Sequence, residues 1–399
     1  MKNIDELLDQ LLEKIQGRLS AAELQWFHKI GETLKKIYEL PADQINDYAY
    51  SLEYRETISA DLRKLNNLLK TAHIENIQDI ESMFDNLITT VYENGQEIAE
   101  LKKQGLSSKA IYRKTVTPLL RKTMRDYTIM AKSTTTDKIY RDTMRKMVNK
   151  MTINSEKTNY HQAMRAAVTE LSQQGISYVH YDNKKHPYTR RLDSSVRVSL
   201  SGEMNQVVQT IQNKLASEIG ADSFEITVEH ASAPDHEGVQ GKIFEAAEFE
   251  KLQSGESAVD IDGETHILEK RAIGQYNCRH GAMPFLLGIS EPSYSREELD
   301  MVNRTNKEGI EFDGEKMSLY SATQWQRANE TEQRRERGKL EIIRQVAGND
   351  PAFRQDMRES QARIKELRTD YARLGKVLEP HGINMKHGRK YNINARGFR

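Results

Sequence analysis

Residues 4–40 read IDELLDQLLEKIQGRLSAAELQWFHKIGETLKKIYEL, and this stretch decides how the first part of the chain folds. Apolar side chains recur in its first half at intervals of three and four residues: Ile4, Leu7, Leu8, Leu11, Leu12 and Ile15. That spacing puts them on one face of an amphipathic helix. Ser20 followed by Glu23 matches a capping box, the pair with which many helices begin. The stretch therefore predicts one helix before Ser20 and a second after it, closed by Pro41.

The same helical period continues beyond Pro41. The expected helices cover residues 50–70, 76–104, 107–131 and 155–175. Asn94-Gly95 indicates a break within the second of them, and the last ends at a glycine, as helices often do. With only 22 Gly and 8 Pro in the whole chain, we expect residues 1–175 to form a region of long helices.

The pattern changes near residue 176. ISYVHYD (176–182) alternates in the manner of a strand, and FEITVEHA (224–231) is the clearest strand pattern in the chain. Between them, the segment that begins RRLDSSVR predicts an amphipathic helix that ends at Gly220. Asp262-Gly263 indicates a hairpin turn. These signals predict a small α+β domain over residues 176–296.

Residues 297–399 return to charged helical sequence, which is interrupted at Gly348-Asn349-Asp350-Pro351 and ends in a basic, glycine-containing segment. The predicted fold class is therefore α+β, in three parts. A long-helical N-terminal region precedes a small α+β head domain, and a charged helical tail follows it.

Charge is strongly segregated along the chain although the formal net charge is zero. Residues 1–100 hold 10 basic and 19 acidic side chains, and residues 203–320 hold 10 and 23. Residues 101–150 hold 14 basic and 3 acidic side chains, and residues 321–399 hold 18 and 10. Such blocks suit docking onto charged surfaces, with nucleic acid as a candidate for the basic ones. Helices of opposite charge that pack on one another are the alternative.

Composition excludes several classes of protein. A single cysteine excludes an intramolecular disulfide framework. No apolar stretch approaches the twenty or so residues of a spanning helix, and the first residues lack the apolar run of a signal peptide. We expect a soluble protein, made in the cytoplasm, without a membrane span.

The cysteine belongs to a group of four candidate metal ligands in two pairs. His230 and His236 form one pair, and Cys278 and His280 form the other. Zinc accepts thiolate and imidazole, so two such pairs brought together would make a structural zinc site. Ordinary packing of a buried cysteine is the alternative that the spacing leaves open.

Catalysis by the same residues is a further alternative. A Cys278–His280 nucleophile pair requires an orienting group, for which Asp235 and Asn277 are candidates. A metal-dependent hydrolase or nuclease requires a base such as Asp235 or Glu237 and an open coordination position. The chain has no GxSxG, P-loop or HExxH motif, and we expect no enzymatic activity.

The basic blocks supply candidate contacts to DNA or to an acidic protein partner. Tyrosines are interleaved with the cations of residues 101–150, and no motif that docks into a DNA groove is present. Any binding to DNA is therefore expected to be non-specific. The candidate residues are Arg113, Lys114, Arg121, Lys122, Arg141, Arg145, Lys146, Lys386, Arg389 and Lys390.

An ordered series of motifs resembles one family. RRLDSSVR (190–197) is followed by MNQ (204–206), a strand that ends in His230, and His236 with QGKIF (240–244). GQYNCRHGAMPFLLGISEPSYS (274–295) closes the series. Over residues 176–296 the chain resembles the portal-associated phage minor capsid proteins of the minor capsid protein 2 type. It is more distantly similar to the Mu F-like head morphogenesis proteins. The motif residues are Arg190, Arg191, Asp193, Arg197, Gln240, Gly241, Lys242, Phe244, Asn277 and Arg279.

The resemblance implies a structural protein of the phage or prophage virion, located in the head near the portal and synthesised in the bacterial host cytoplasm. It implies portal and capsid proteins as partners, and a role in head assembly and in DNA packaging or delivery. It implies no small-molecule substrate.

Overall fold

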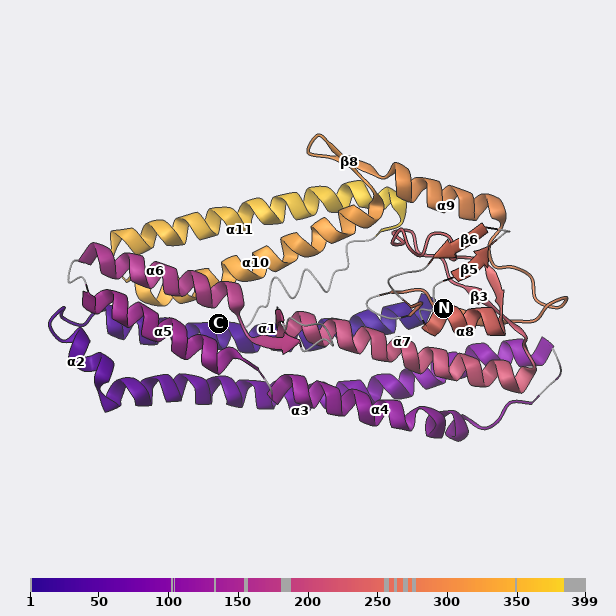
Figure 1. The fold of residues 1–399 in the computed structure, drawn as a ribbon, viewed down its shortest axis with the longest axis horizontal. Coiled ribbons are helices and arrows are strands. Elements are labelled where there is room, and N and C mark those ends of the chain that lie inside the picture. The colour runs from indigo at the N-terminus through magenta and orange to yellow at the C-terminus, as the bar shows by residue number, and fades with distance from the viewer. Residues whose placement is uncertain are drawn as a thin grey trace.

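The structure is a computed structural model, and it describes residues 2–101, 103, 105–132, 134–153, 157–180, 188–254, 258–261, 264–267, 272–274, 278–348 and 350–383. Long helices run along the longest axis of an elongated molecule, and most of the short strands gather at one end of it (Figure 1). The predicted class is confirmed, since the chain is a mostly helical α+β protein.

Helices make up most of the described chain. They are α1 (Lys2–Tyr38), α2 (Ile45–Tyr50), α3 (Leu52–Leu101), α4 (Lys109–Lys132), α5 (Thr136–Ile153), α6 (Lys157–Gln174), α7 (Leu192–Ile219), α8 (Ala246–Ser254), α9 (Arg296–Glu308), α10 (Leu319–Ala347) and α11 (Pro351–Leu378). Among the described residues, none of these helices combines the length and the apolar character needed to cross a lipid bilayer.

The strands are short and pair only in antiparallel fashion in the described chain. They are β1 (Ser177–His180), β2 (Tyr188–Arg191), β3 (Ser223–Ile226), β4 (Ile243–Glu245), β5 (Ala258–Ile261), β6 (Glu264–Ile267), β7 (Ala282–Phe285), β8 (Ile310–Phe312) and β9 (Glu315–Met317). A three-stranded sheet has the order β4–β3–β7, and the other strands form the hairpins β1–β2, β5–β6 and β8–β9.

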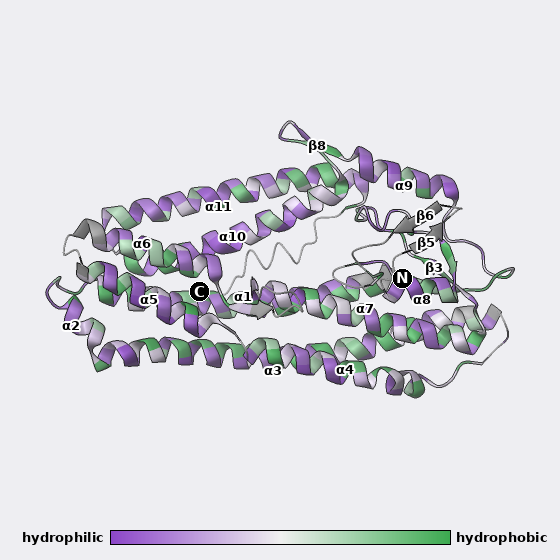
Figure 2. Ribbon diagram, viewed as in Figure 1, coloured by the Kyte–Doolittle hydropathy of each residue, from purple (hydrophilic) through white to green (hydrophobic). Residues whose placement is uncertain are grey.

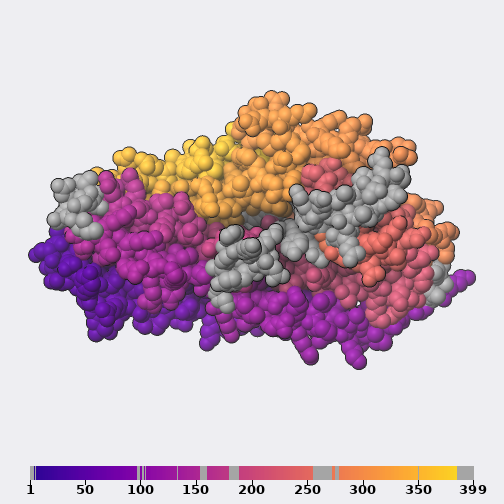
Figure 3. All heavy atoms as spheres, in the orientation of Figure 1, coloured from indigo at the N-terminus to yellow at the C-terminus, as the bar shows by residue number. Residues whose placement is uncertain are grey.

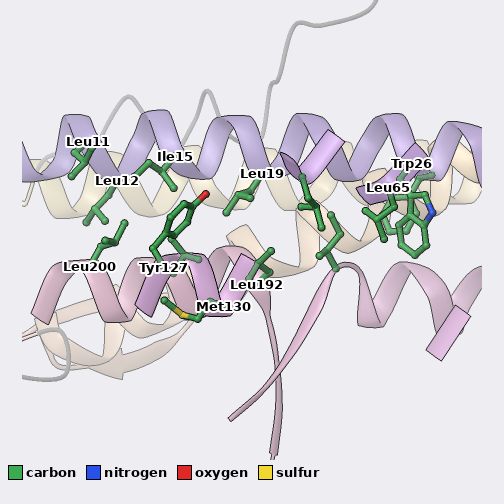
Figure 4. Packing of buried hydrophobic residues seen from close by; sticks show 14 of the residues in the cluster. Leu11, Leu12, Ile15, Leu19, Trp26, Leu65, Tyr127, Met130, Leu192 and Leu200 are labelled. Carbon is green, nitrogen blue, oxygen red and sulfur yellow. The ribbon is translucent and has the colours of Figure 1, made fainter. Parts of the chain in front are cut away.

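One large hydrophobic core holds helices from distant parts of the chain together. Figure 4 shows side chains of α1 converging with those of three other helices: Leu65 of α3, Tyr127 and Met130 of α4, and Leu192 and Leu200 of α7. The α1 side chains labelled in that view are buried: Leu11, Leu12, Ile15, Leu19 and Trp26. The helical period of the opening stretch predicts this for its apolar face. Hydrophobic and hydrophilic residues alternate along each long helix in Figure 2, as expected of helices with one buried face.

Two predicted helix breaks are wrong. α1 continues through Ser20, which is buried, and the carboxylate of Glu23 accepts a hydrogen bond from the Ile176 amide (2.8 Å) instead of capping a helix. α3 likewise continues through Asn94-Gly95. A Cβ on Gly95 would lie 2.7 Å from a methyl carbon of Leu215, so this glycine permits close packing of α3 against α7.

A second, smaller hydrophobic core lies between the three-stranded sheet β4–β3–β7 and the helix α8. Phe224 and Phe244 are cross-strand partners in β3 and β4, and Phe224 stacks on Phe249 of α8. The strand predicted over 224–231 is shorter than expected, because β3 ends at Ile226. The predicted hairpin is confirmed by the pairing of β5 with β6, although Asp262-Gly263 itself lies outside the described residues.

The charged C-terminal segment folds as predicted and also contains elements that the sequence analysis missed. α10 ends at Ala347 and α11 begins at Pro351, on either side of the predicted break. The hairpin β8–β9 was not predicted, although its turn, Asp313-Gly314, has the positive φ angles (53° and 80°) that an Asp-Gly turn favours.

The N-terminal helix α1 packs beside α10, a helix from the C-terminal part of the described chain. A Cβ on Gly31 of α1 would lie 2.6 Å from Cβ of Gln345 in α10. Gly338 of α10 makes an equally close approach to the ring of Phe27 in α1. In Figure 3 the orange and yellow C-terminal residues accordingly form one long edge of the same body as the N-terminal residues. The division into parts at residues 175 and 296 stays a prediction.

Glu218 attaches the end of α7 to the segment that connects α3 with α4. Its carboxylate accepts hydrogen bonds from the Ser107 amide (3.0 Å) and the Tyr112 hydroxyl (2.7 Å), and it pairs with Lys214 (2.7 Å). Burial alone would raise the pKa of Glu218, but the hydrogen bonds from Lys214, Ser107 and Tyr112 outweigh it and lower this pKa to about 2.

Because the folded pKa of Glu218 lies below the ordinary glutamate value of about 4.3, its contribution to stability is complete above that value. It is lost as the pH falls toward 2.

We expect Glu218→Gln to lower the free energy of unfolding at neutral pH by about 2 kcal/mol, since it removes a charged acceptor. The variant should also lose less stability than the wild type between pH 5 and the acid limit. Denaturant titrations across this range test both expectations, with Glu56→Gln, at an exposed position of α3, as the control. Parallel acid curves for the two variants would contradict them.

Candidate metal centre and the surrounding networks

Three of the four predicted ligands meet in one buried cluster. Candidate ligand atoms of His236, Cys278 and His280 lie within 4.8 Å of one another. The Cys278 Sγ atom lies 3.3 Å from Nδ1 of His236 and 3.3 Å from Nδ1 of His280. The exposed fractions are only 1% for His236 and 4% for each of the other two residues.

Backbone hydrogen bonds on two segments hold the cluster in place. His236 lies in a turn, where its amide donates to the carbonyl of Ala233 (2.9 Å) and its carbonyl accepts from Gln240 (3.2 Å). Cys278 and His280 lie just before β7, and the carbonyl of Cys278 accepts a hydrogen bond from Nδ2 of Asn205 in α7 (2.7 Å). Asn205 belongs to the MNQ motif, so this motif connects the long-helical core to the cysteine segment.

Gln240 sets the orientation of the His280 ring. Its Oε1 atom accepts a hydrogen bond from the backbone amide of Glu229 (2.9 Å) and lies 3.2 Å from Nε2 of His280. Its Nε2 atom donates to Oδ1 of Asn303 (2.7 Å), whose own Nδ2 donates to the backbone carbonyl of Glu237 (3.4 Å). This series of hydrogen bonds begins and ends at backbone groups. Exchanging the oxygen and nitrogen of either side-chain amide would therefore lose a hydrogen bond.

This arrangement decides which nitrogen of His280 carries the proton. Because Oε1 of Gln240 is an acceptor, Nε2 of His280 must donate to it. In the neutral ring, Nδ1 of His280 therefore presents its lone pair to the sulfur of Cys278.

His230, expected in the same cluster, is not part of it. It is exposed, and its ring faces Gly382 beyond the end of α11. The reason is the early end of β3: the chain turns at residues 229–232, where the Ser232 amide donates to the carbonyl of Glu229 (3.2 Å). The turn carries His230 away from the sheet.

The residues considered for catalysis have different surroundings. Oδ2 of Asp235 lies 4.0 Å from Nε2 of His236, on the side of that ring away from the sulfur. Glu237 instead accepts a hydrogen bond from Asn306 of α9 (2.5 Å) and pairs with Lys307 (3.6 Å). Asn277 lies outside the described residues.

The RRLDSSVR motif builds a buried ionic network across four elements. Arg191, at the end of β2, pairs with Glu23 of α1 and with Asp193 at the start of α7 (3.7 Å). Asp193 also pairs with Arg334 of α10 (3.2 Å). Burial opposes ionisation of Asp193, but Arg334 and Arg191 outweigh it and lower its pKa. The ionic partners of Arg191 among the described residues come from α1 and from the motif itself, and not from the acidic block of residues 203–320.

The other motif residues have structural contacts too. Arg190 is partly buried and lies over the ring of Tyr188, 5.3 Å from its centroid. Arg279 donates to Asp9 of α1 (3.3 Å), and Arg197 lines a small cavity beside both of these residues. Gly241 has a positive φ of 70°, Phe244 is buried in the second core, and the carbonyl of Lys242 accepts from Ile226 (2.9 Å).

The basic block of residues 101–150 forms exposed helix faces with many ion pairs. Arg113 pairs with Asp85, Lys122 with Glu203, Arg141 with Asp137, Arg145 with Asp142, and Lys146 with Glu170. Lys114 and Arg121 are exposed on α4. The expected contacts Lys386, Arg389 and Lys390 lie outside the described residues.

A second basic surface, missed as a site by the sequence analysis, is a groove of about 790 Å³ between α10 and α11. Among the described residues that line it, one is acidic, Glu341, and six are cationic: Arg337, Arg344, Lys365, Arg368, Arg373 and Lys376. Burial and the neighbouring charges of Arg368 and Arg344 lower the pKa of Arg337 to about 10. We call this surface the α10–α11 groove. Arg344 pairs with Glu341 (3.7 Å), and Arg373 pairs with Asp313 and with Asp370 (3.2 Å). Cations remain in excess among the described lining residues, which favours an anionic occupant.

The fold and these sites define a mostly helical α+β protein with one large hydrophobic core, buried polar networks and strongly charged faces. The chain belongs to the family described as phage minor capsid protein 2, whose model matches residues 3–372. None of the curated proteins and none of the solved structures matches it. It is therefore a structural protein of the phage head, and its place is the virion. The match confirms the resemblance seen over residues 176–296 and extends it into the helical segments on both sides.

Proposed function

We propose that the protein associates with the portal of the phage head, and that it assists head assembly and DNA packaging or delivery by binding, without catalysing a reaction. The family match over residues 3–372 carries this proposal. The unequal charge of the surface supports it, since the α10–α11 groove and the faces of α4 and α5 can contact acidic partners. On this proposal the chain is synthesised in the host cytoplasm before it joins the head.

Labelling of intact phage heads tests the location. An affinity tag on this protein, detected by electron microscopy, should mark a single vertex, and cross-linking of purified heads should join it to the portal protein. Labels spread evenly over the capsid would contradict the proposal. The purified protein, assayed with and without zinc, should hydrolyse neither DNA nor cell wall; activity that disappears in Cys278→Ser would favour the metal-dependent hydrolase instead.

Contact with DNA is a second candidate function, favoured by the α10–α11 groove. The groove presents an excess of cations among its described lining residues. We expect non-specific DNA binding that weakens steeply with salt, and Arg337→Gln with Arg368→Gln should reduce the salt slope by about 2.

The double variant Lys114→Gln with Arg121→Gln removes two exposed cations from α4 and is the matched comparison. If only this second variant weakens binding, the DNA contact lies on the basic block of residues 101–150. If the wild-type protein does not bind DNA at low salt, the groove is a docking surface for a protein and not for DNA.

A further inference from the structure

We propose that His236, Cys278 and His280 supply ligands to a zinc site, in which both histidines coordinate through Nδ1. This inference is independent of the proposed function, because it rests on the geometry of the cluster alone. His230 is not a ligand in this site.

The separations between ligand atoms fit tetrahedral zinc. Zn–S and Zn–N bonds of about 2.3 and 2.0–2.1 Å, at the tetrahedral angle, place sulfur and nitrogen about 3.5 Å apart. The sulfur of Cys278 lies 3.3 Å from both Nδ1 atoms. The rings of His236 and His280 have their centroids 5.3 Å apart, and candidate ligand atoms of all three residues lie within 4.8 Å of one another.

The tautomer of His280 makes a lone pair available to a cation. Gln240 requires Nε2 of His280 to be the protonated nitrogen, which leaves its Nδ1 as a lone pair. A zinc ion would accept this lone pair, the Nδ1 lone pair of His236 and the sulfur of Cys278 deprotonated to thiolate.

The surroundings have the features of a supported metal site. Metal-bound histidines usually donate their second ring nitrogen to a fixed acceptor, which orients the ring. His280 has such an acceptor in Gln240, which is itself held by Glu229 and Asn303. The Cys278 segment is held from the other side by Asn205. Soft thiolate together with imidazole selects zinc over magnesium or calcium.

Metal analysis and cobalt substitution of the purified full-length protein test the site. After loading with zinc and removal of the excess, we expect close to one zinc ion per chain. Cobalt in its place should give a thiolate-to-cobalt charge-transfer band and the intense visible bands of tetrahedral coordination. Zinc removal by a chelator should lower the melting temperature.

Four variants separate a ligand role from a structural one, and of these His280→Ala should lose the metal. Cys278→Ser should abolish the charge-transfer band, and Gln240→Leu should weaken cobalt binding about 10–100-fold while leaving the band in place at saturation. His230→Ala, a histidine outside the cluster, should bind as the wild type does. The proposal is overturned if the wild-type chain retains no zinc and gives no charge-transfer band with cobalt, or if His230→Ala removes the metal as effectively as His280→Ala. The cobalt spectrum of the wild type decides the question even if a variant fails to fold.

Discussion

Replacing Arg191 by methionine is expected to lower the free energy of unfolding by about 3–5 kcal/mol, because it leaves buried carboxylates without their partner. The guanidinium pairs with Glu23 and Asp193, and each of these three side chains is less than a tenth exposed. Asp193 keeps Arg334, but Glu23 loses the one cationic partner that it has among the described residues. A buried carboxylate in that position must either protonate or pay the cost of desolvation.

The neighbouring arginine supplies the control. Arg190 precedes Arg191 by one residue, is only partly buried, and in its described surroundings contacts Tyr188 alone, through the hydroxyl (3.3 Å) and the ring. Arg190→Met should therefore lower the free energy of unfolding by no more than about 1 kcal/mol, the size of a partly exposed cation–π contact. Urea denaturation of both variants measures the two free energies of unfolding. Equal losses would show that the buried ionic network does not stabilise the protein.

A double variant separates the lost ion pair from the loss of packing. Glu23→Gln combined with Arg191→Met removes both charges of the central pair, so it should be less destabilising than the sum of the two single changes. Strict additivity would mean that Glu23 and Arg191 do not stabilise one another. Asp193 remains paired with Arg334 in every variant of this cycle.

Gly31→Ala is expected to destabilise the protein by about 1–3 kcal/mol, the second large effect, because it forces α1 and α10 apart. A methyl group at this position would lie 2.6 Å from Cβ of Gln345 and 2.8 Å from the carbonyl oxygen of Ile342. A backbone oxygen cannot turn aside as a flexible side chain can. The overlap therefore outweighs the gain of about 1 kcal/mol in helix propensity that alanine normally brings over glycine.

The same substitution at Gly202 should have the opposite sign. Gly202 lies within α7, and a Cβ there would meet nothing within 4 Å. Gly202→Ala should therefore stabilise the protein by about 0.5–1 kcal/mol. Thermal and urea unfolding of the two variants, side by side, measure the difference. If Gly31→Ala also stabilises the protein, the close approach of α1 to α10 is not as tight as the structure has it.

Local patterns in the sequence predicted most helices, but they also predicted breaks at Ser20 and Asn94-Gly95 where α1 and α3 are continuous. Ser20 and Glu23 have the identities and spacing of a capping box, yet α1 passes straight through them. The same two residue types also suit a buried position in a helix whose partners come from elsewhere in the chain. Glu23 binds Arg191 and the Ile176 amide, and nothing within residues 4–40 indicates those partners. Gly95 was misread for the same reason, since its packing partner, Leu215, is distant in sequence.

The candidate site was predicted in part. The pairing of a histidine with the Cys278 segment followed from residue chemistry, and the structure brings His236, Cys278 and His280 together. His230 was predicted as a fourth ligand, and this is wrong because β3 ends at Ile226, four residues before it. Strand propensity alone does not locate such an end. Gln240 was noted only as a motif residue, and its contact with His280 requires the turn that follows His236.

The sequence by itself determined most of the helical segments, though not α5 or α8, and it determined that the chain is a mostly helical α+β protein and to which family it belongs. These properties depend on period, composition and ordered motifs, all of which are local or additive along the chain. Only the tertiary structure decided that α1 is one helix, that Arg191 pairs with Glu23, that His230 lies apart from the cluster, and that cations line the α10–α11 groove. The physical reason is burial: whether a charge, a glycine or an imidazole is removed from water, and what meets it there, is set by residues far away in sequence.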